Sequence, residues 1–307
     1  MNQIRAMRVF LRVAELGSLT AASADLGYSH GMASSILSEL ESYLGVRLLE
    51  RTTRGARLTE EGAIYAERAR GILAQIEALE DDVGGAEKIP RGTLRVQIPP
   101  GLLRLVVAPE LPGFFAEYPE VRLELMARNV VPDFVGDRLD AAVFVGDLPD
   151  SAMVARNVGL VPLITLAAPG YLARRGAPET PADLAAHDTV GVMASATGRA
   201  SPWTFRKGDA TERFTPLGPL IVEEVGAAVT AATGGIGIVQ LASYLAYNEV
   251  RSGRLVPVLD DWRPGAFDVR LVLPPGGLRP RKLRVFEDFL VAASERFRAR
   301  WGIRDIR

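Results

Sequence analysis

The sequence predicts an α/β protein in which a small helical unit with a β-hairpin precedes a larger module of alternating strands and helices. Apolar residues recur at steps of three and four through much of residues 3 to 83, as in amphipathic helices. From residue 93 onward, short runs of branched apolar residues alternate with stretches of helical spacing, as in βα units. The chain has 307 residues, so we expect two or three domains rather than one core.

The composition is that of a globular protein and excludes several kinds of site. Hydrophobic residues make up 48% of the chain and charged residues 24%. There is no cysteine, which excludes disulfides, thiol catalysis and cysteine-ligated metals. Arginines interrupt the first 19 residues, and no window offers about 18 uncharged apolar residues, so neither a signal peptide nor a membrane span is expected. We expect a cytoplasmic protein. The net charge of -1 argues against a uniformly basic nucleic-acid binder but leaves room for a local basic surface.

Three helices are expected in residues 3 to 45. The first spans residues 3 to 16, Ser18 caps the second, which Gly27 ends, and Ser29 caps the third, which Gly45 closes. The side chains expected to face inward are Ile4, Met7, Leu11, Ala14, Ala22, Leu26, Ala33, Leu37, Leu40 and Leu44. A stripe of Arg5, Arg8 and Arg12 is more simply a solvated face than a phosphate contact. Two short helices joined by a glycine-containing turn predict a helix-turn-helix.

Residues 46 to 59 predict a β-hairpin wing. Strands near Leu48 to Arg51 and Ala56 to Leu58 flank a TTRG turn. The arginines of this stretch, which are Arg47, Arg51, Arg54 and Arg57, face a single acidic residue, Glu50. The sequence therefore concentrates positive charge on the wing.

A long helix is expected from Thr59, its cap, to about Val83. Apolar and small residues alternate at steps of three and four along it, at Gly62, Tyr65, Ala69, Ile72, Ile76, Leu79 and Val83. So narrow a stripe is a heptad seam, which favours pairing with a second copy of the chain. Packing against the chain's own body is the alternative. Residues 84 to 92 break the helix and predict a hinge or linker.

The remainder predicts an α/β module built from parallel-sheet units. The expected strands are TLRVQI, VRLELM, AAVFV and LITLAA, then TVGVM, LIVEE, IGIVQ and DVRLVLP. Helices are expected over Leu105 to Tyr118 and from about Lys282 to Arg300. The run TGGIGIV at residues 233 to 239 lacks a complete nucleotide-loop pattern and predicts a helix-to-strand turn. His187 beside Asp188 favours a capping or surface role over catalysis, since no nucleophile turn accompanies them.

Ordered series of residues resemble one family along nearly the whole chain. The N-terminal series are FLRVAELGSLTAA (residues 10 to 22), LGYSHGMASS (26 to 35), LESYLGVRL (40 to 48) and RTTRGARLTEEG (51 to 62). The C-terminal series include YPEVRL from Tyr118, LDAA from Leu139, PGYL from Pro169 and GRLVPVL from Gly253. Together they resemble the LysR-type transcriptional regulators.

The resemblance implies a winged helix-turn-helix, a dimerising linker helix and a two-lobed effector domain of periplasmic-binding-protein type (type 2). By this reading residues 1-58 bind DNA, residues 59-89 form the linker helix and hinge, residues 90-164 plus 268-303 form lobe I, and residues 165-267 form lobe II. The implied function is that of a sequence-specific transcription regulator controlled by a small molecule bound between the lobes. Members of the family are commonly tetramers, so a homodimer through the linker helix and a homotetramer are expected.

DNA affinity comes largely from neutralising phosphates, whereas sequence is read by groups that reach base edges. The third helix has neither lysine nor arginine, so we expect wing arginines to supply charge and a serine-rich helix face to lie in the major groove. The residues expected to contact DNA are Ser18, Thr20, Ser29, His30, Gly31, Met32, Ser34, Ser35, Ser38, Arg51, Thr53 and Arg54. A small-residue helix face without base contacts is the alternative for the serines.

By the same resemblance, an effector should contact residues that follow the strands of the two lobes. These are Pro100, Gly101, Leu102, Arg128, Asn129, Val130, Phe144, Ser195, Thr197 and Gln240. Phe144 and the PPGLL turn favour an aromatic or amphipathic acid, whose carboxylate Arg128 or Arg199 could hold. The residues expected at the dimer seam are Tyr65, Ala69, Ile72, Ile76, Leu79 and Val83. No cofactor and no metal are expected, and no catalytic constellation favours an enzyme. A cytoplasmic small-molecule-binding protein with weakened or lost DNA binding remains the alternative function.

Overall fold

The computed structural model describes residues 2–52, 55–83, 89–146, 153–193, 198–274 and 279–301. The chain separates into two compact units, one comprising Met1–Lys88 with Leu278–Arg281 and the other comprising Ile89–Gly277 with Lys282–Arg307. Within the described ranges, no helix combines the length and the hydropathy that a membrane-spanning segment requires.

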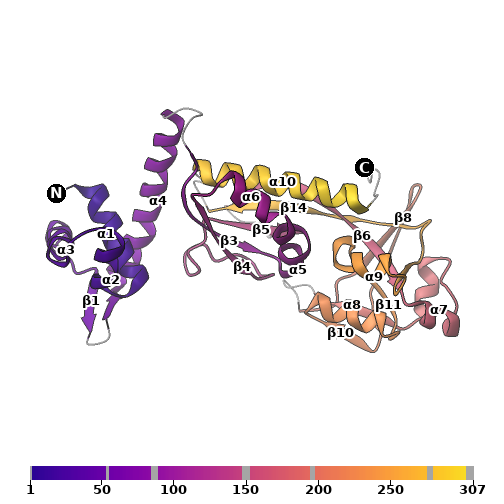
Figure 1. The fold of residues 1–307 in the computed structure, drawn as a ribbon. Helices are drawn as coiled ribbons and strands as arrows, with labels where there is room; N and C mark the ends of the chain where they lie inside the picture. The colour runs from indigo at the N-terminus through magenta and orange to yellow at the C-terminus, as the bar shows by residue number, and fades with distance from the viewer. Residues whose placement is uncertain are drawn as a thin grey trace. The chain divides into compact units, whose positions relative to one another are not determined.

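The first unit is a winged helix-turn-helix followed by one long helix (Figure 1). Its elements are α1 (Gln3–Leu16), α2 (Leu19–Asp25), α3 (His30–Leu44), β1 (Leu49–Thr52), β2 (Gly55–Leu58) and α4 (Glu60–Val83). Side chains cap the helices where the sequence predicts. The hydroxyl of Ser18 accepts from the Ala21 N–H at 3.2 Å, that of Ser29 from the Met32 N–H at 3.2 Å, and that of Thr59 from the Gly62 N–H at 2.9 Å.

One apolar core holds this unit together. Its buried members come from the inward faces of α1, α2, α3 and α4 and from the start of the wing. They are Ala6, Val9, Phe10, Leu11, Val13, Ala22, Ala33, Leu37, Leu40, Leu48, Leu49, Ala66, Ala69 and Leu73. The inward-facing residues read from the sequence are only partly correct, because Ile4 and Leu44 are 39% and 36% exposed. On α1 the core face includes Val9, Phe10 and Val13, which the spacing did not single out.

The seam of α4 divides into two parts. Ala69 is buried and Tyr65 half-buried in the chain's own core, where the Tyr65 ring meets Phe10 edge-on at 5.3 Å between centroids. Ile72 and Leu79, in contrast, are 41% and 63% exposed. Ile76 packs against the same core, and the side chain of Val83 lies outside the described residues. Both interpretations of the stripe thus apply to part of it, because Tyr65, Ala69 and Ile76 pack within the chain whereas Ile72 and Leu79 are exposed.

The second unit is built on one mixed sheet. Its strands follow the order β10-β7-β11-β6-β14-β5-β3-β4, and β12 pairs with β6 beside this path. The strands are β3 (Gly92–Ile98), β4 (Val121–Ala127), β5 (Ala141–Val145), β6 (Val154–Ala167), β7 (Thr189–Val192), β10 (Leu220–Val222), β11 (Ile238–Ala242), β12 (Val256–Pro257) and β14 (Ala266–Leu273). A separate sheet has the order β13-β8-β9, with β8 (Trp203–Lys207), β9 (Ala210–Phe214) and β13 (Arg263–Pro264).

Short helical segments connect these strands, and one long helix, α10, follows the last of them. They are α5 (Pro100–Leu102), the π-helical turn η1 (Leu103–Val107), η2 (Ala108–Glu110), α6 (Leu111–Glu117), α7 (Pro169–Arg175), η3 (Pro181–Ala186), α8 (Val225–Thr233), η4 (Ser243–Ala246), α9 (Tyr247–Arg251) and α10 (Arg281–Trp301). The expected turn in residues 233 to 239 is confirmed, since α8 ends at Thr233 and β11 begins at Ile238.

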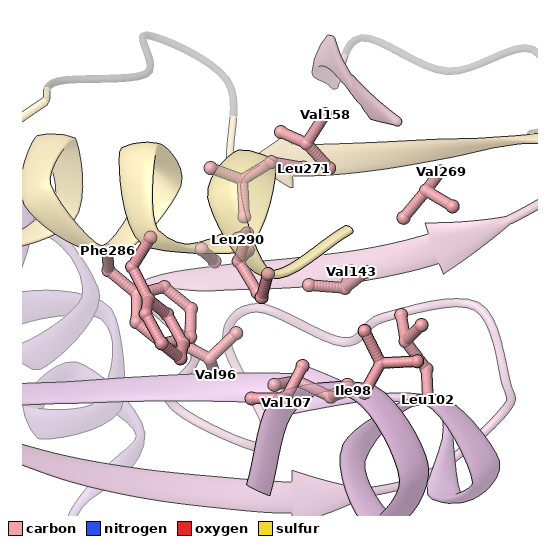
Figure 2. Close-up of a cluster of buried hydrophobic side chains, with 14 of the residues drawn as sticks. Val96, Ile98, Leu102, Val107, Val143, Val158, Val269, Leu271, Phe286 and Leu290 are labelled. Carbon is pink, nitrogen blue, oxygen red and sulfur yellow. The ribbon is translucent and has the colours of Figure 1, made fainter. Parts of the chain in front are cut away.

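The sheet carries two separate cores. One includes Val96 of β3, Val143 of β5, Leu271 of β14 and the α10 residues Phe286 and Leu290. Figure 2 shows Phe286 and Leu290 reaching from α10 toward β3 and β5. The other core gathers α7, α8, β7 and β11 around residues such as Leu166 and Ile238. The unit is therefore two-lobed, and β6 contributes to both cores.

The sequence predicts parallel-sheet units, but the observed sheet is mixed. β3 pairs in parallel with β4 and β5, and β7 with β10 and β11, but β6 is antiparallel to both β11 and β14. Parallel pairing needs a crossover connection between neighbours. β6 and β14 instead pass between the lobes in opposite chain directions, and therefore pair antiparallel. The β8–β9 hairpin was not predicted at all.

Candidate DNA-binding surface and effector site

The solvent-facing side of α3 presents the polar residues singled out in the sequence. Ala33, Leu37 and Leu40 are buried on the opposite side, with at most 4% exposure. The described side chains of the outer face are exposed at His30, Gly31, Met32, Ser35 and Ser38 and half-buried at Ser34. An uncharged, small-residue surface is thus open to a partner rather than packed into the protein's own interior.

A cation from α1 lies beside this surface. The guanidinium of Arg5 stacks over the Tyr28 ring at 4.6 Å from its centroid and approaches the Met32 Sδ at 3.2 Å. The sequence interpretation of this stripe as a solvated face missed the contact, because Arg5 and Met32 lie 27 positions apart. The positive charge absent from α3 itself is therefore partly supplied by α1.

Arg12, on the same stripe, has a structural role. Its Nε and Nη2 donate to the two carboxylate oxygens of Asp25, both at 2.7 Å, and its Nη1 reaches Glu15 at 2.9 Å. The hydrogen bonds to Asp25 and then to Glu15 raise the pKa of the Arg12 guanidinium. This forked contact joins the end of α2 to α1 and fixes the angle of the helix-turn-helix.

Two contacts from helices fix the wing. The carboxylate of Glu41, on α3, accepts hydrogen bonds from the N–H groups of Leu48 at 2.8 Å and Leu49 at 3.1 Å. The Ala56 N–H donates to the carbonyl of Gly17, at the end of α1, at 2.7 Å. The wing is therefore held against both α1 and α3, although the sequence suggested neither contact.

The remaining predicted DNA contacts are placed as follows. Ser18 and Ser29 lie at the starts of α2 and α3, and Thr20 is exposed on α2. Arg51 belongs to β1, but its side chain, together with Thr53 and Arg54, lies outside the described residues. Arg47 and Arg57 are exposed at either end of the wing.

In the second unit, the residues that follow β3 differ in accessibility. Pro100 is exposed at the start of α5, Gly101 is half-buried, and Leu102 is 3% exposed within the first core. A Cβ on Gly101 would overlap the Leu245 side chain, so a larger residue would require Leu245 of η4 to shift. The side chain of Leu102 serves the core in this structure and is not open to a ligand.

The residues after β4 surround a buried amide. Asn129 and Val130 are exposed, and Arg128 forms an ion pair with Asp137 at 2.6 Å. The carbonyl of Val130 accepts from the Nε2 of Gln97, a β3 residue with 1% exposure, at 2.7 Å. The Oε1 of Gln97 has no hydrogen-bond partner among the described residues. Sequence reasoning missed Gln97, although a lone amide in the apolar run TLRVQI was a usable signal.

The other predicted effector residues are dispersed. Phe144 is half-buried on β5, opposite Arg270 of β14. Gln240 is buried on β11 and donates to the hydroxyl of Thr165 on β6 at 3.1 Å. Ser195 and Thr197 lie outside the described residues. These positions do not by themselves gather the predicted effector residues into one site.

His187 belongs to a local hydrogen-bond network. The Tyr171 hydroxyl accepts from the Asp188 N–H at 2.9 Å and lies 3.1 Å from the Nδ1 of His187. Burial, and then the charge of Arg175, lowers the pKa of His187. The pair His187 and Asp188 thus anchors η3 to α7. Across the described ranges, no group of three or more potential ligand side chains could hold a metal ion.

Comparisons with known proteins point to the same family over most of the chain. Residues 88–295 match the family described as LysR substrate binding domain, and residues 4–63 match the bacterial regulatory helix-turn-helix proteins of the lysR family. A transcriptional regulator of Xanthomonas campestris pv. campestris is 37% identical over 92% of this chain and 83% of its own. A transcriptional repressor of Pseudomonas aeruginosa is 34% identical over 93% of this chain and 89% of its own. The solved structure of CrgA from Neisseria meningitidis has a TM-score of 0.59 and 30% identity, covering 94% of this chain and 97% of that one.

Proposed function

Because the chain belongs to the LysR family of transcriptional regulators, we propose that its α3 face and wing bind promoter DNA and that a small molecule between the two lobes changes this binding. Regulators of this family bind DNA and small-molecule effectors and form oligomers. The observation that carries the proposal is the open polar face of α3, whose opposite side is anchored in the core.

The α3 face suits a major groove by shape. Gly31, Ser35 and Ser38 are small, so the helix axis can approach the base edges closely, and hydroxyls can donate or accept there. A serine contact lacks the forked geometry that gives about 1 to 3 kcal/mol of discrimination per base. We therefore propose that DNA shape and paired half-sites carry much of the specificity.

We propose that arginines around the exposed α3 face bind the DNA phosphates. Arg47 and Arg57 are exposed on the wing, and Arg5 lies beside Met32. Arg51 and Arg54 extend the same basic stretch of sequence. Removing one arginine that binds a phosphate should lower the slope of log affinity against log salt by about one.

The test measures fluorescence anisotropy of a DNA fragment from upstream of the protein's own gene, beside a shuffled fragment. Arg57→Ala should weaken binding to both fragments and flatten the salt dependence. Ser35→Ala with Ser38→Ala should instead reduce the preference for the genuine fragment. Arg213→Ala, exposed on β9 in the other unit, is the matched control. An unchanged salt slope and unchanged preference would remove the proposal in favour of a small-molecule-binding protein that has lost DNA binding.

We propose that the exposed side of α4, which carries Ile72 and Leu79, pairs with a second copy of the chain. Ile72 and Leu79 are 41% and 63% exposed there, and burying a leucine contributes about 1.5 to 3 kcal/mol. Each substitution occurs twice in a dimer, so Leu79→Glu should raise the dimer dissociation constant by at least about a hundredfold. Glu67→Gln, also exposed on α4, is the control in analytical ultracentrifugation. Equal dimerisation of Leu79→Glu and wild type would exclude this surface. Assembly of such dimers into a tetramer is part of the proposal.

For the effector we propose an aromatic or amphipathic acid bound between lobe I, residues 90-164 plus 268-303, and lobe II, residues 165-267. Pro100, Asn129 and Val130 are exposed near the carboxyl ends of β3 and β4, where ligands of such folds bind. A thermal-shift screen of aromatic and aliphatic acids is the test. A ligand at about 100 times its dissociation constant stabilises the protein by about 2.7 kcal/mol. A preference for short aliphatic dicarboxylates would contradict the proposed ligand class.

A further inference from the structure

A cavity of about 560 Å³ lies away from every residue assigned above to the effector. It forms where the end of β8 and its turn meet β13, the start of β14 and Leu160 of β6. Arg206, Lys207 and Arg263 line it together with Asp261. Its volume falls within the range of about 300 to 1,000 Å³ that is typical of small-molecule sites.

Two of these cations stand directly opposite each other. Arg206 on β8 and Arg263 on β13 are register partners in an antiparallel pair. Side chains so paired have Cβ atoms about 4.5 to 5.5 Å apart, and like charges at such positions repel. Neither guanidinium has a hydrogen-bond or ion-pair partner within the part of the chain that the structure describes.

Asp261, which lines the cavity, and Asp268 on β14 are already engaged. Asp261 forms an ion pair with Lys207 at 3.1 Å. Asp268 is the register partner of Leu160, and its carboxylate binds Arg270 at 2.6 Å and Asn157 at 3.1 Å. Neither of these two carboxylates is therefore paired with the opposed arginines.

We propose that this cavity is a second ligand site, which binds a small oxyanion carrying at least two negative charges. The planar guanidinium groups of Arg206 and Arg263 donate in forks that fit carboxylate or phosphate oxygens. Leu160, Pro264 and Ala266 supply an apolar wall for the rest of the molecule. Bound there, the anion would remove the repulsion between β8 and β13 and join them at the start of β14.

The experiment is isothermal titration of the full-length chain with inorganic phosphate and, separately, with citrate, each at ionic strength matched with sodium chloride. Arg206→Gln and Arg263→Gln are the test variants, and Arg213→Gln, exposed on the neighbouring β9, is the control. At least one anion should bind, and each test variant should weaken it at least tenfold while the control stays within twofold. Tighter phosphate identifies a phosphate-bearing ligand, whereas tighter citrate identifies a polycarboxylate.

Either of two binding results would overturn the proposal. One is binding of neither anion beyond the chloride control, and the other is binding by both test variants with wild-type affinity. Folding is checked by melting without anion, where Arg263→Gln should melt no lower than wild type because a repulsion has been removed. A lower melting temperature would mean that the opposed arginines already stabilise the fold, which contradicts an unneutralised pair. DNA affinity without anion should be unchanged in these variants, so failure here leaves the proposed regulatory function standing.

Discussion

Replacing Glu41 by alanine should release the wing from α3 without touching the exposed α3 face. The Glu41 carboxylate accepts from the Leu48 and Leu49 N–H groups at 2.8 and 3.1 Å, and its side chain is half-buried. Hydrogen bonds to a charged group contribute about 1.5 to 3 kcal/mol each, and water partly replaces them at a half-buried site. We therefore expect a loss of about 2 to 4 kcal/mol in the free energy of opening the wing. Glu41→Gln keeps an acceptor without the charge and should lose about half as much.

Hydrogen exchange measured by mass spectrometry on the full-length chain can follow this opening locally. Peptides covering residues 46 to 59 should exchange about 30 to 1,000 times faster in Glu41→Ala, since 1.4 kcal/mol corresponds to a factor of ten. For the exchange measurement Glu39→Ala is the matched control, because Glu39 is exposed on the same helix and accepts a hydrogen bond from the Ser35 hydroxyl of that helix at 3.4 Å. DNA affinity should fall in the Glu41 variant. Equal exchange rates in both variants would refute the assignment of Glu41 as the wing's anchor.

Three further substitutions test other parts of the fold. Gly55→Ala puts a Cβ against the Gly17 carbonyl oxygen at a φ of +131°, so it should break the wing's contact with α1 and lower DNA affinity. Gly27→Ala is its control: with φ +69° and no atom within 4 Å of the new Cβ, it should lose only about 1 to 2 kcal/mol of unfolding free energy to backbone strain. His187→Gln should flatten the pH dependence of thermal stability, because burial and the charge of Arg175 lower the pKa of His187. The contribution of His187 to folding stability is therefore present above the ordinary pKa of 6.5 and is lost as the pH falls below it. An equal pH slope in wild type and variant would contradict this. Phe286→Ala removes a ring with 0% exposure whose centroid lies 5.8 Å from that of Phe289, and it should reduce the unfolding free energy of the second unit by about 3 to 5 kcal/mol in urea titrations. Phe267→Ala, at a residue 39% exposed, is the control and should have a much smaller effect. Similar losses in the two variants would contradict the assignment of Phe286 to the first core.

The helical unit could be predicted closely from the sequence because its signals are local. Ser18, Ser29 and Thr59 cap helices within three residues of their own positions. The spacing of α3 correctly identified Ala33, Leu37 and Leu40 as inward-facing but was wrong for Leu44, which is 36% exposed at the end of the helix. The fold class, with its two-lobed α/β unit, was also confirmed.

What escaped prediction depends on residues far apart in the chain. Arg5 and Met32 are 27 positions apart in the sequence, Gln97 and Val130 are 33 apart, and Arg206 and Arg263 are 57 apart. The β8–β9 hairpin was missed since WTFRKGDATERF mixes charged and apolar residues without a regular alternation. Likewise, the branched runs of β6 and β14 read as buried strands, but nothing in them specifies an antiparallel neighbour.

The chain passes between its two cores along β6 and β14, which are hydrogen-bonded to each other from Val154 to Pro162 and from Ala266 to Leu273. Two antiparallel strands joined in this way resist sliding, because sliding would break the whole ladder at once, but they yield to torsion about their common axis. The ladder is already irregular between Val269 and Arg270. A rotation of one lobe against the other would therefore twist these two strands about each other.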